Sequence, residues 1–133
     1  MAIFSDLSSN FQLIDYSPTH GQLLIRCLKN KQRDYNIDII FKGVLHILIP
    51  VVFNGIEIAA AEINEDNGYL VANYGFKISG DYRIFSITDT KSKIYYLNAM
   101  CFGVYHNKLD SLETSIGRYD MDSLGENILW YAD

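Results

Sequence analysis

Residues 36–63 read NIDIIFKGVLHILIPVVFNGIEIAAAEI, and the fold class depends on this stretch. Its odd positions from Ile37 to Ile49 are apolar apart from Gly43, whereas its even positions mix polar and apolar residues. An alternation with a period of two predicts a half-buried β-strand. A single strand over residues 37–49 would be unusually long, and Gly43 has no side chain to pack. We therefore expect one strand bent at Gly43, or two strands in sequence.

The Asn54-Gly55 pair has the composition of a two-residue type I′ hairpin turn, in which both residues need a positive φ. A turn there would fold the chain back and keep the apolar residues of both arms on one face. Pro50 weighs against a regular hairpin, because proline has no N–H to donate. Asn54 and Glu57 also have capping-box spacing, which favours a short helix over residues 56–62. The sequence leaves strand and helix open for residues 54–63.

The rest of the chain predicts further strands, at residues 11–16, 22–29, 69–74, 82–88 and 94–105. Short polar turns separate the first three strands, which is typical of an antiparallel meander. After the strands, Leu109, Leu112 and Ile116 have helical spacing before a C-cap glycine. Residues 123–131 predict either one turn of helix or an irregular docked tail.

The predicted fold is therefore a single mainly β domain over residues 1–133. We expect an antiparallel sandwich or partly open barrel with one or two short helices toward the C-terminus. The chain has 133 residues, of which 49% are hydrophobic, so it is long enough to bury a core. The residues predicted to lie in that core are Ile25, Ile39, Leu45, Ile47 and Phe85.

The N-terminus and the apolar runs of the sequence predict a cytoplasmic protein without a membrane-spanning segment. Residues 1–13 lack the basic region and long apolar core of a secretory signal. The longest apolar run, residues 44–53, is interrupted by His46 and Pro50 and is much shorter than a membrane span. In the cytoplasm Cys27 and Cys101 would be reduced, buried side chains.

The negative charge is concentrated at the C-terminal end. The formal net charge is −5, and residues 109–133 hold six acids and one base, so they supply all of it. Nucleic acid is an unfavourable partner, since phosphate binding needs a basic stripe. The segment is either a solvated face or a docking surface for a basic protein. The candidate partner-binding residues are Asp110, Glu113, Tyr119, Asp120, Asp122, Glu126 and Trp130.

An internal explanation competes with the docking surface. The basic turn with Lys29, Lys31 and Arg33 would then neutralise part of the acidic segment within the same molecule. We expect no catalytic, cofactor or metal site, because phosphate-binding glycine motifs and nucleophile elbows are absent and the three histidines lack zinc-ligand spacing. Whether His20, His46 and His106 converge in space is left open.

The residues Tyr16-Ser17-Pro18-Thr19-His20, the strand 23–26 and the strand 39–44 resemble the opening of several small bacterial proteins without known activity. Some of those proteins are similar to the immunity proteins encoded beside polymorphic toxins. The resemblance lies between Tyr16 and Val44. It implies an interaction protein and identifies no catalytic residue.

Two functional hypotheses from different classes follow. The first is a small cytoplasmic interaction protein, of immunity or regulatory type, that binds a basic protein partner through its acidic, aromatic C-terminal surface. The second is a ligand-binding or enzymatic β-fold whose site residues converge only in three dimensions. The second hypothesis requires a deep pocket that holds two or more polar groups, whereas the first requires only a convex or shallow acidic patch. Self-association is open under both.

Overall fold

The computed structural model describes residues 2–118 and 125–132, with the backbone alone for Gly125 and Glu126. Its elements are β1 (Phe4–Ser17), β2 (Gln22–Cys27), β3 (Asn36–Lys42), β4 (His46–Leu48), β5 (Val52–Ala61), α1 (Tyr69–Ala72), β6 (Arg83–Thr88), β7 (Ile94–Ala99), β8 (Cys101–Asn107) and β9 (Gly125–Tyr131). The strands of the described chain form one antiparallel sheet in the order β4-β7-β6-β5-β1-β2-β3-β8-β9. The sheet is not closed into a barrel. A mainly β antiparallel fold is confirmed.

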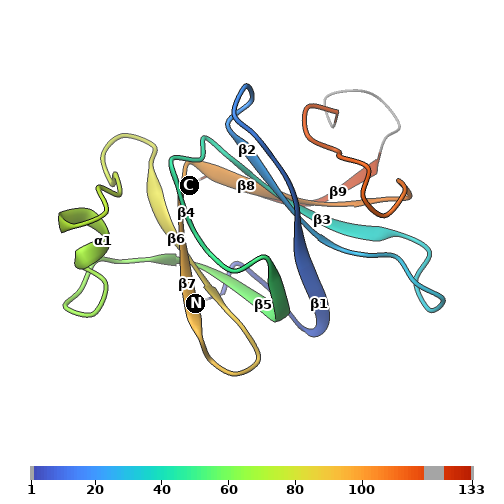
Figure 1. Ribbon diagram of the computed structural model, residues 1–133, viewed down its shortest axis with the longest axis horizontal. Coiled ribbons are helices and arrows are strands. Elements are labelled where there is room, and N and C mark those ends of the chain that lie inside the picture. Colours follow the sequence, from blue (N-terminus) through green and yellow to red (C-terminus); the bar gives the residue numbers. More distant parts are fainter. Residues whose placement is uncertain (1, 119–124, 133) are drawn as a thin grey trace.

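Two neighbouring bends give the sheet its shape. Gly43 separates β3 from β4 with a φ of +65°, and Met100 separates β7 from β8. The Met100 N–H donates to the Lys42 carbonyl at 3.0 Å, so the two bends lie side by side. Consequently β3 pairs with β8 while β4 pairs with β7. In Figure 1 the strands β4, β6 and β7 form one half of the sheet, and they run roughly crosswise to the strands β3, β8 and β9 of the other half.

The main core lies between these two halves. Phe41, Phe85 and Phe102 are its centre, with ring centroids 5.1–5.5 Å apart. Ile25 and Ile39 are also fully buried in this cluster. The prediction that Ile25, Ile39 and Phe85 lie in the core is confirmed, because β2, β3 and β6 each keep the expected alternation.

The prediction is wrong for Leu45 and Ile47, which are 46% and 39% exposed. The left-handed backbone of Gly43 ends β3 and resets the alternation on which both assignments depended. Moreover, β4 has three residues and lies at the edge of the sheet, where β7 is its one strand partner within the described part of the chain. An edge strand has a neighbour on one side alone, so its side chains stay partly exposed.

The Asn54-Gly55 hairpin is also wrong, because β5 continues straight through this pair. Gly55 has a φ of +79°, but among the described non-glycine residues only Ser92 has a positive φ, so the type I′ geometry is not met at Asn54. The opposing strand β1 bulges between Asp6 and Asn10 at this point. A Cβ on Gly55 would lie 2.9 Å from the Leu7 carbonyl oxygen, so this glycine permits the close approach of the bulge. The helix alternative for residues 56–62 fails with it.

Residues 69–74 were predicted as a strand, but Tyr69–Ala72 is the helix α1. The side chain of Asn67 organises the preceding turn: it accepts from the Asn64 N–H at 2.8 Å and donates to the Glu62 carbonyl at 2.9 Å. Behind the turn, Leu70 packs in a small separate cluster. This local turn and its packing outweigh the strand preference of the aromatic and branched residues.

The helices predicted toward the C-terminus are wrong for the described residues. Residues 109–118 form an irregular segment with short turns, and residues 125–131 form strand β9 along the edge of β8. The backbone carbonyls of Asp110 and Ser111 accept hydrogen bonds from the Arg26 side chain at 3.1 and 3.0 Å. These tertiary bonds draw the chain onto the sheet and override the helical spacing of its leucines.

Candidate functional site

The irregular segment 109–118 covers a buried polar cluster on the face of β2, β3 and β8 that points away from the main core. Arg26 and Asp38 lie opposite each other on β2 and β3, and both are fully buried. Arg26 Nε and Nη2 donate to the two oxygens of Asp38 at 2.6 and 2.9 Å. The pair is therefore bidentate, the geometry in which arginine and a carboxylate bind most strongly.

Neutral side chains complete this cluster. Asn107 Nδ2 and Ser115 Oγ each donate to Asp38 Oδ2 at 2.7 Å. Asn36 Nδ2 donates to Asn107 Oδ1 at 2.9 Å and to the Leu109 carbonyl at 3.0 Å. No buried side-chain N or O atom of the described residues lacks a hydrogen-bond partner. A fully satisfied cluster without solvent contact is suited to anchoring the segment.

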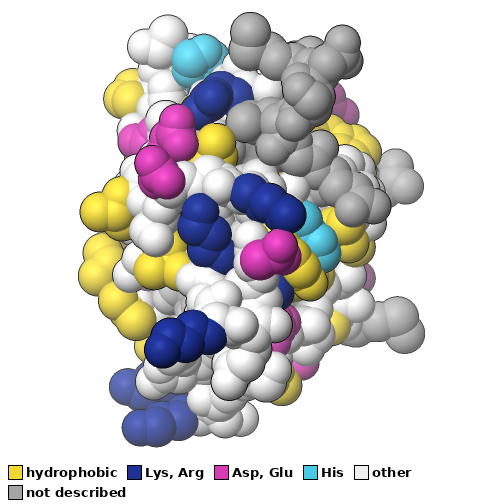
Figure 2. All heavy atoms as spheres, turned by 90° about the vertical axis from the view of Figure 1, so that its right-hand side faces the viewer, with side chains coloured by type: hydrophobic (Ala, Val, Ile, Leu, Met, Phe, Trp, Pro, Cys, Tyr) yellow, Lys and Arg dark blue, Asp and Glu magenta, His cyan; other side chains and the backbone are white. Residues whose placement is uncertain are grey.

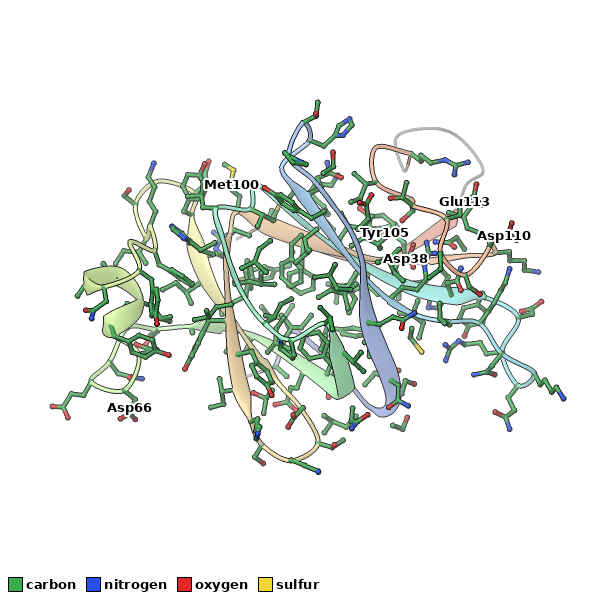
Figure 3. The ribbon with its side chains drawn as sticks, in the orientation of Figure 1. Asp38, Asp66, Met100, Tyr105, Asp110 and Glu113 are labelled. Atoms are coloured by element: carbon green, nitrogen blue, oxygen red, sulfur yellow. The ribbon has the colours of Figure 1, made fainter. Side chains whose placement is uncertain are left out.

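The predicted partner-binding residues are partly brought together. Asp110 and Glu113 are exposed on the segment, and Figure 3 places them on the side of the sheet where Asp38 and Tyr105 also lie. Trp130 on β9 pairs with Gly103, which puts it on the same face as Tyr105. Tyr119, Asp120 and Asp122 lie outside the described residues, and the side chain of Glu126 is not described either.

Charge on the described part of this surface is more balanced than the sequence predicts. Arg118 donates to Glu113 at 3.1 Å, and this hydrogen bond lowers the pKa of Glu113 below its ordinary value. Lys108 pairs with Asp34 at 3.0 Å and lowers the pKa of that carboxyl in the same way. Figure 2 shows Lys and Arg side chains gathered at this end of the molecule, which carries the β2–β3 turn. The acidic excess therefore rests mainly on residues 119–133.

The internal neutralisation proposed for the basic turn does not take place among the described residues. Lys29 Nζ donates to the backbone carbonyl of Lys108 at 3.0 Å, not to a carboxylate. Arg33 donates to the Tyr35 carbonyl and to its own turn. The ion pair that joins the turn to the C-terminal part runs the other way, from Lys108 to Asp34.

The three histidines lie on different elements and serve local contacts. His20 Nδ1 lies 3.0 Å from Ser17 Oγ in the β1–β2 turn. His46 stacks on Phe76 with ring centroids 4.9 Å apart. His106 stacks on Tyr35 at 4.3 Å. Within the described chain, no group of three or more His, Cys, Asp or Glu side chains could hold a metal ion. No described helix is long and apolar enough to cross a membrane.

Both cysteines are free thiols. Cys27 is buried and its Sγ accepts a hydrogen bond from Arg33 Nη2 at 2.8 Å. Cys101 is half-buried, and this burial raises the pKa of its thiol although Lys42 and Arg83 act in the opposite direction. A raised pKa leaves less thiolate at neutral pH, and the thiolate is the reactive form.

We expect iodoacetamide to alkylate Cys101 in a Cys27→Ser variant more slowly at pH 7.5 than it alkylates a short unstructured cysteine peptide. The pH of half-maximal rate should also lie above that of the peptide, because the native thiol holds its proton longer. Mass spectrometry of quenched samples gives both rates. The same variant in urea is the control and should match the peptide. Alkylation of native Cys101 at the rate of the peptide would contradict this prediction.

A pocket, which the sequence reasoning missed, lies between β1 and the turn joining β2 to β3. Polar side chains from both parts of the chain line it: Ser8, Ser9, Asn10 and Gln12 from β1, and Asn30, Gln32 and Arg33 from the turn. The signal in the sequence is weak: two polar stretches stand about twenty residues apart, and only the antiparallel pairing of β1 with β2 brings them together. The pocket brings several polar side chains together, which is one of the two features that the ligand-binding hypothesis requires.

Comparisons of the chain with protein-family models, with curated proteins and with solved structures find no match.

Proposed function

We propose that this chain is a small interaction protein of immunity or regulatory type, acting in the cytoplasm on a basic protein partner. The contact surface is formed by β9 and by segment 109–118, and we call it the β9 surface. Its described members are Asp110, Glu113, Ile128 and Trp130.

The observation that carries the proposal is the exposure of large apolar side chains on an edge strand. Trp130 and Ile128 are 49% and 46% exposed. Within the described chain β9 is the last strand of the sheet, so its outer backbone edge has no strand partner. Tryptophan is enriched among the residues that dominate interface energetics, and an open edge can accept further backbone hydrogen bonds.

Trp130 and Asp110 are the groups of this surface that would contact a cationic partner. Lys42 Nζ already lies 5.1 Å from the centroid of the indole ring, in a cation–π contact on one face. An arginine of a partner could stack on the other face in the same manner. Asp110 adds a carboxylate without an ion-pair partner among the described residues. Electrostatic attraction of this kind acts mainly on the rate of association.

The test starts with the tagged wild-type chain, which is used to isolate its partner from a lysate of the native host. The partner should carry a basic surface. Trp130→Ser should then raise the dissociation constant by about thirtyfold or more, the effect of losing an interface anchor of about 2 kcal/mol. Asp110→Asn should slow association at low salt, and the difference should shrink at high salt. Biosensor kinetics at two ionic strengths measure both effects.

A matched pair of substitutions at the other end of the molecule is the control. Tyr74→Ser removes an aromatic side chain that is 54% exposed. Asp66→Asn removes a carboxylate that lies at the other end of the molecule from Asp110 in Figure 3. Both should leave binding unchanged. The proposal fails if the control variants lose as much affinity as Trp130→Ser, or if Trp130→Ser binds like the wild type.

A further inference from the structure

The pocket between β1 and the β2–β3 turn has a volume of about 450 Å³, within the range of small-molecule sites. Its walls are built from three parts of the chain: Ser8 to Gln12, Arg26 to Leu28, and the turn residues Asn30, Gln32 and Arg33, with Val52 beside them. None of these residues is acidic, and none belongs to the β9 surface. The site is therefore separate from the surface proposed for the protein partner.

The pocket exists because β1 continues where β2 has ended. The ladder between the two strands starts at Gln12 and Arg26, and the chain leaves the sheet after Cys27. The Leu13 N–H donates to Val51 on the β5 side, at 2.8 Å. By alternation the N–H and C=O of Asn10 point to the opposite side, into the space that β2 has vacated. One wall of the pocket thus carries a backbone donor and acceptor that no backbone group of the described residues pairs with.

The opposite wall presents a guanidinium group in a fixed position. Arg33 Nε donates to the Tyr35 carbonyl at 3.0 Å, and Nη2 donates to the Leu28 carbonyl at 3.2 Å. The side chain is half-buried and makes no ion pair with a described carboxylate. Its Nη1 has no hydrogen-bond partner among the described residues. Two bonds to carbonyls and one to sulfur thus hold the group while leaving one nitrogen for a ligand.

The turn that carries Arg33 is itself braced. Asn30 Oδ1 accepts from the backbone N–H groups of Gln32 and Arg33 at 2.8 and 3.0 Å. Asn30 Nδ2 and the side-chain amides of Gln12 and Gln32 have no hydrogen-bond partner in the described part of the chain. They add neutral donors and acceptors around a guanidinium that its own hydrogen bonds hold in position before a ligand arrives.

Charge decides the class of ligand. The other arginine in the wall, Arg26, is neutralised by Asp38, so Arg33 is the one positive charge of the pocket that no carboxylate of the described residues compensates. One guanidinium matches a carboxylate, whereas a phosphate with nearly two negative charges is usually held by more than one cation. The carbonyl of Asn10 and the amide oxygens of Gln12 and Gln32 require donors on the ligand.

We propose that this pocket binds a small organic monocarboxylate that also carries an N–H or O–H donor. The carboxylate contacts Arg33 Nη1, and the donor contacts the open edge of β1 at Asn10. A free hydroxy acid and the C-terminal end of a peptide share this chemistry. Such a small ligand should bind with a dissociation constant of about 1–10 mM.

The experiment is a titration of the ¹⁵N-labelled chain, followed by the backbone amide shifts of residues 8–12 and 30–33. Lactate represents a free hydroxy acid, and N-acetylglycine represents a peptide C-terminus. The probe with the lower dissociation constant shows which of the two ligand types the pocket prefers. Lactamide and N-acetylglycinamide are the uncharged controls and should bind at least about tenfold more weakly. Inorganic phosphate tests the alternative anion.

Arg33→Gln should reduce carboxylate affinity about tenfold or more, since it removes the cation. Lys31→Gln is the matched control, because Lys31 is exposed on the same turn but does not line the pocket, and it should bind normally. Gln12→Ala provides a second test, because it leaves the hydrogen bonds of Asn30 and Arg33 intact. It should weaken carboxylate binding while the amide shifts outside the pocket stay unchanged. The proposal is overturned if the amides bind as well as the acids, if phosphate binds more tightly, or if no probe shifts these residues. Partner binding at the β9 surface should be unaffected by Arg33→Gln, so the two proposals fail independently.

Discussion

Asp38→Asn should lower the free energy of unfolding by about 3–5 kcal/mol, the cost of leaving a buried charge without its partner. Asp38 accepts two hydrogen bonds from Arg26 and one each from Asn107 and Ser115. An asparagine keeps one of the two oxygens and turns an NH₂ group toward these donors. Arg26 would then stay charged in a site without solvent. Urea unfolding monitored by circular dichroism measures the loss, which is a large share of the stability of an ordinary domain.

Two further variants sharpen this prediction. Asp34→Asn removes a carboxylate from the exposed ion pair with Lys108, whose side chain is 72% exposed, and it should change stability little. The double variant Arg26→Met, Asp38→Leu replaces the buried pair by apolar side chains and should recover much of the loss of Asp38→Asn. A loss below about 1 kcal/mol in Asp38→Asn would show that the buried pair is not what anchors segment 109–118.

The buried pair also shows what could be predicted from the sequence. Arg26 and Asp38 both fall on the mixed face of their strands, beside the apolar Leu24 and Ile40. In the β2–β3 hairpin they stand directly opposite each other. Opposite charges at facing positions of a hairpin predict a contact. Their complete burial is not predictable from the strands, because the cover comes from residues 109–118, far along the chain.

The regular part of the fold follows from local patterns, and two of the errors share one cause. Alternation identified the strands around Ile25, Ile39 and Phe85, since each of these strands keeps its own parity. The errors at Asn54-Gly55 and at residues 109–118 arise because a distant segment supplies the deciding contact. The bulge of β1 accommodates Gly55 within a strand, and the side chain of Arg26 holds residues 109–118 away from a helix. Such contacts have no periodicity along the sequence.

The two proposed sites differ in how much of each could be predicted from the sequence. Trp130 and Asp110 were candidates on charge and residue type, and pairing places Trp130 on the face of the sheet that segment 109–118 covers. Arg33 was predicted only as part of a basic turn. Its position in a pocket depends on β2 ending at Cys27 while β1 continues, a difference in strand length that alternation does not reveal.

The second large effect is expected at the centre of the core. Phe85→Ala should lower the free energy of unfolding by about 3–5 kcal/mol, because it removes a fully buried ring and leaves a cavity. The ring contacts Phe41, Phe102 and Tyr131 at centroid distances of 5.5, 5.4 and 5.9 Å, so three aromatic contacts are lost together.

Ile47→Ala is the matched truncation on the edge strand β4. From the alternation of the long strand alone it would cost about 2–5 kcal/mol, the value for a fully buried isoleucine. Since Ile47 is 39% exposed, we expect a loss of about 1 kcal/mol or less. Urea unfolding of the two variants separates the alternatives. If both variants have the same m-value, the difference between their midpoints gives the difference in the free energy of unfolding. A loss for Ile47→Ala as large as that for Phe85→Ala would mean that residues 45–47 continue the buried alternation of β3 and that Gly43 does not reset it.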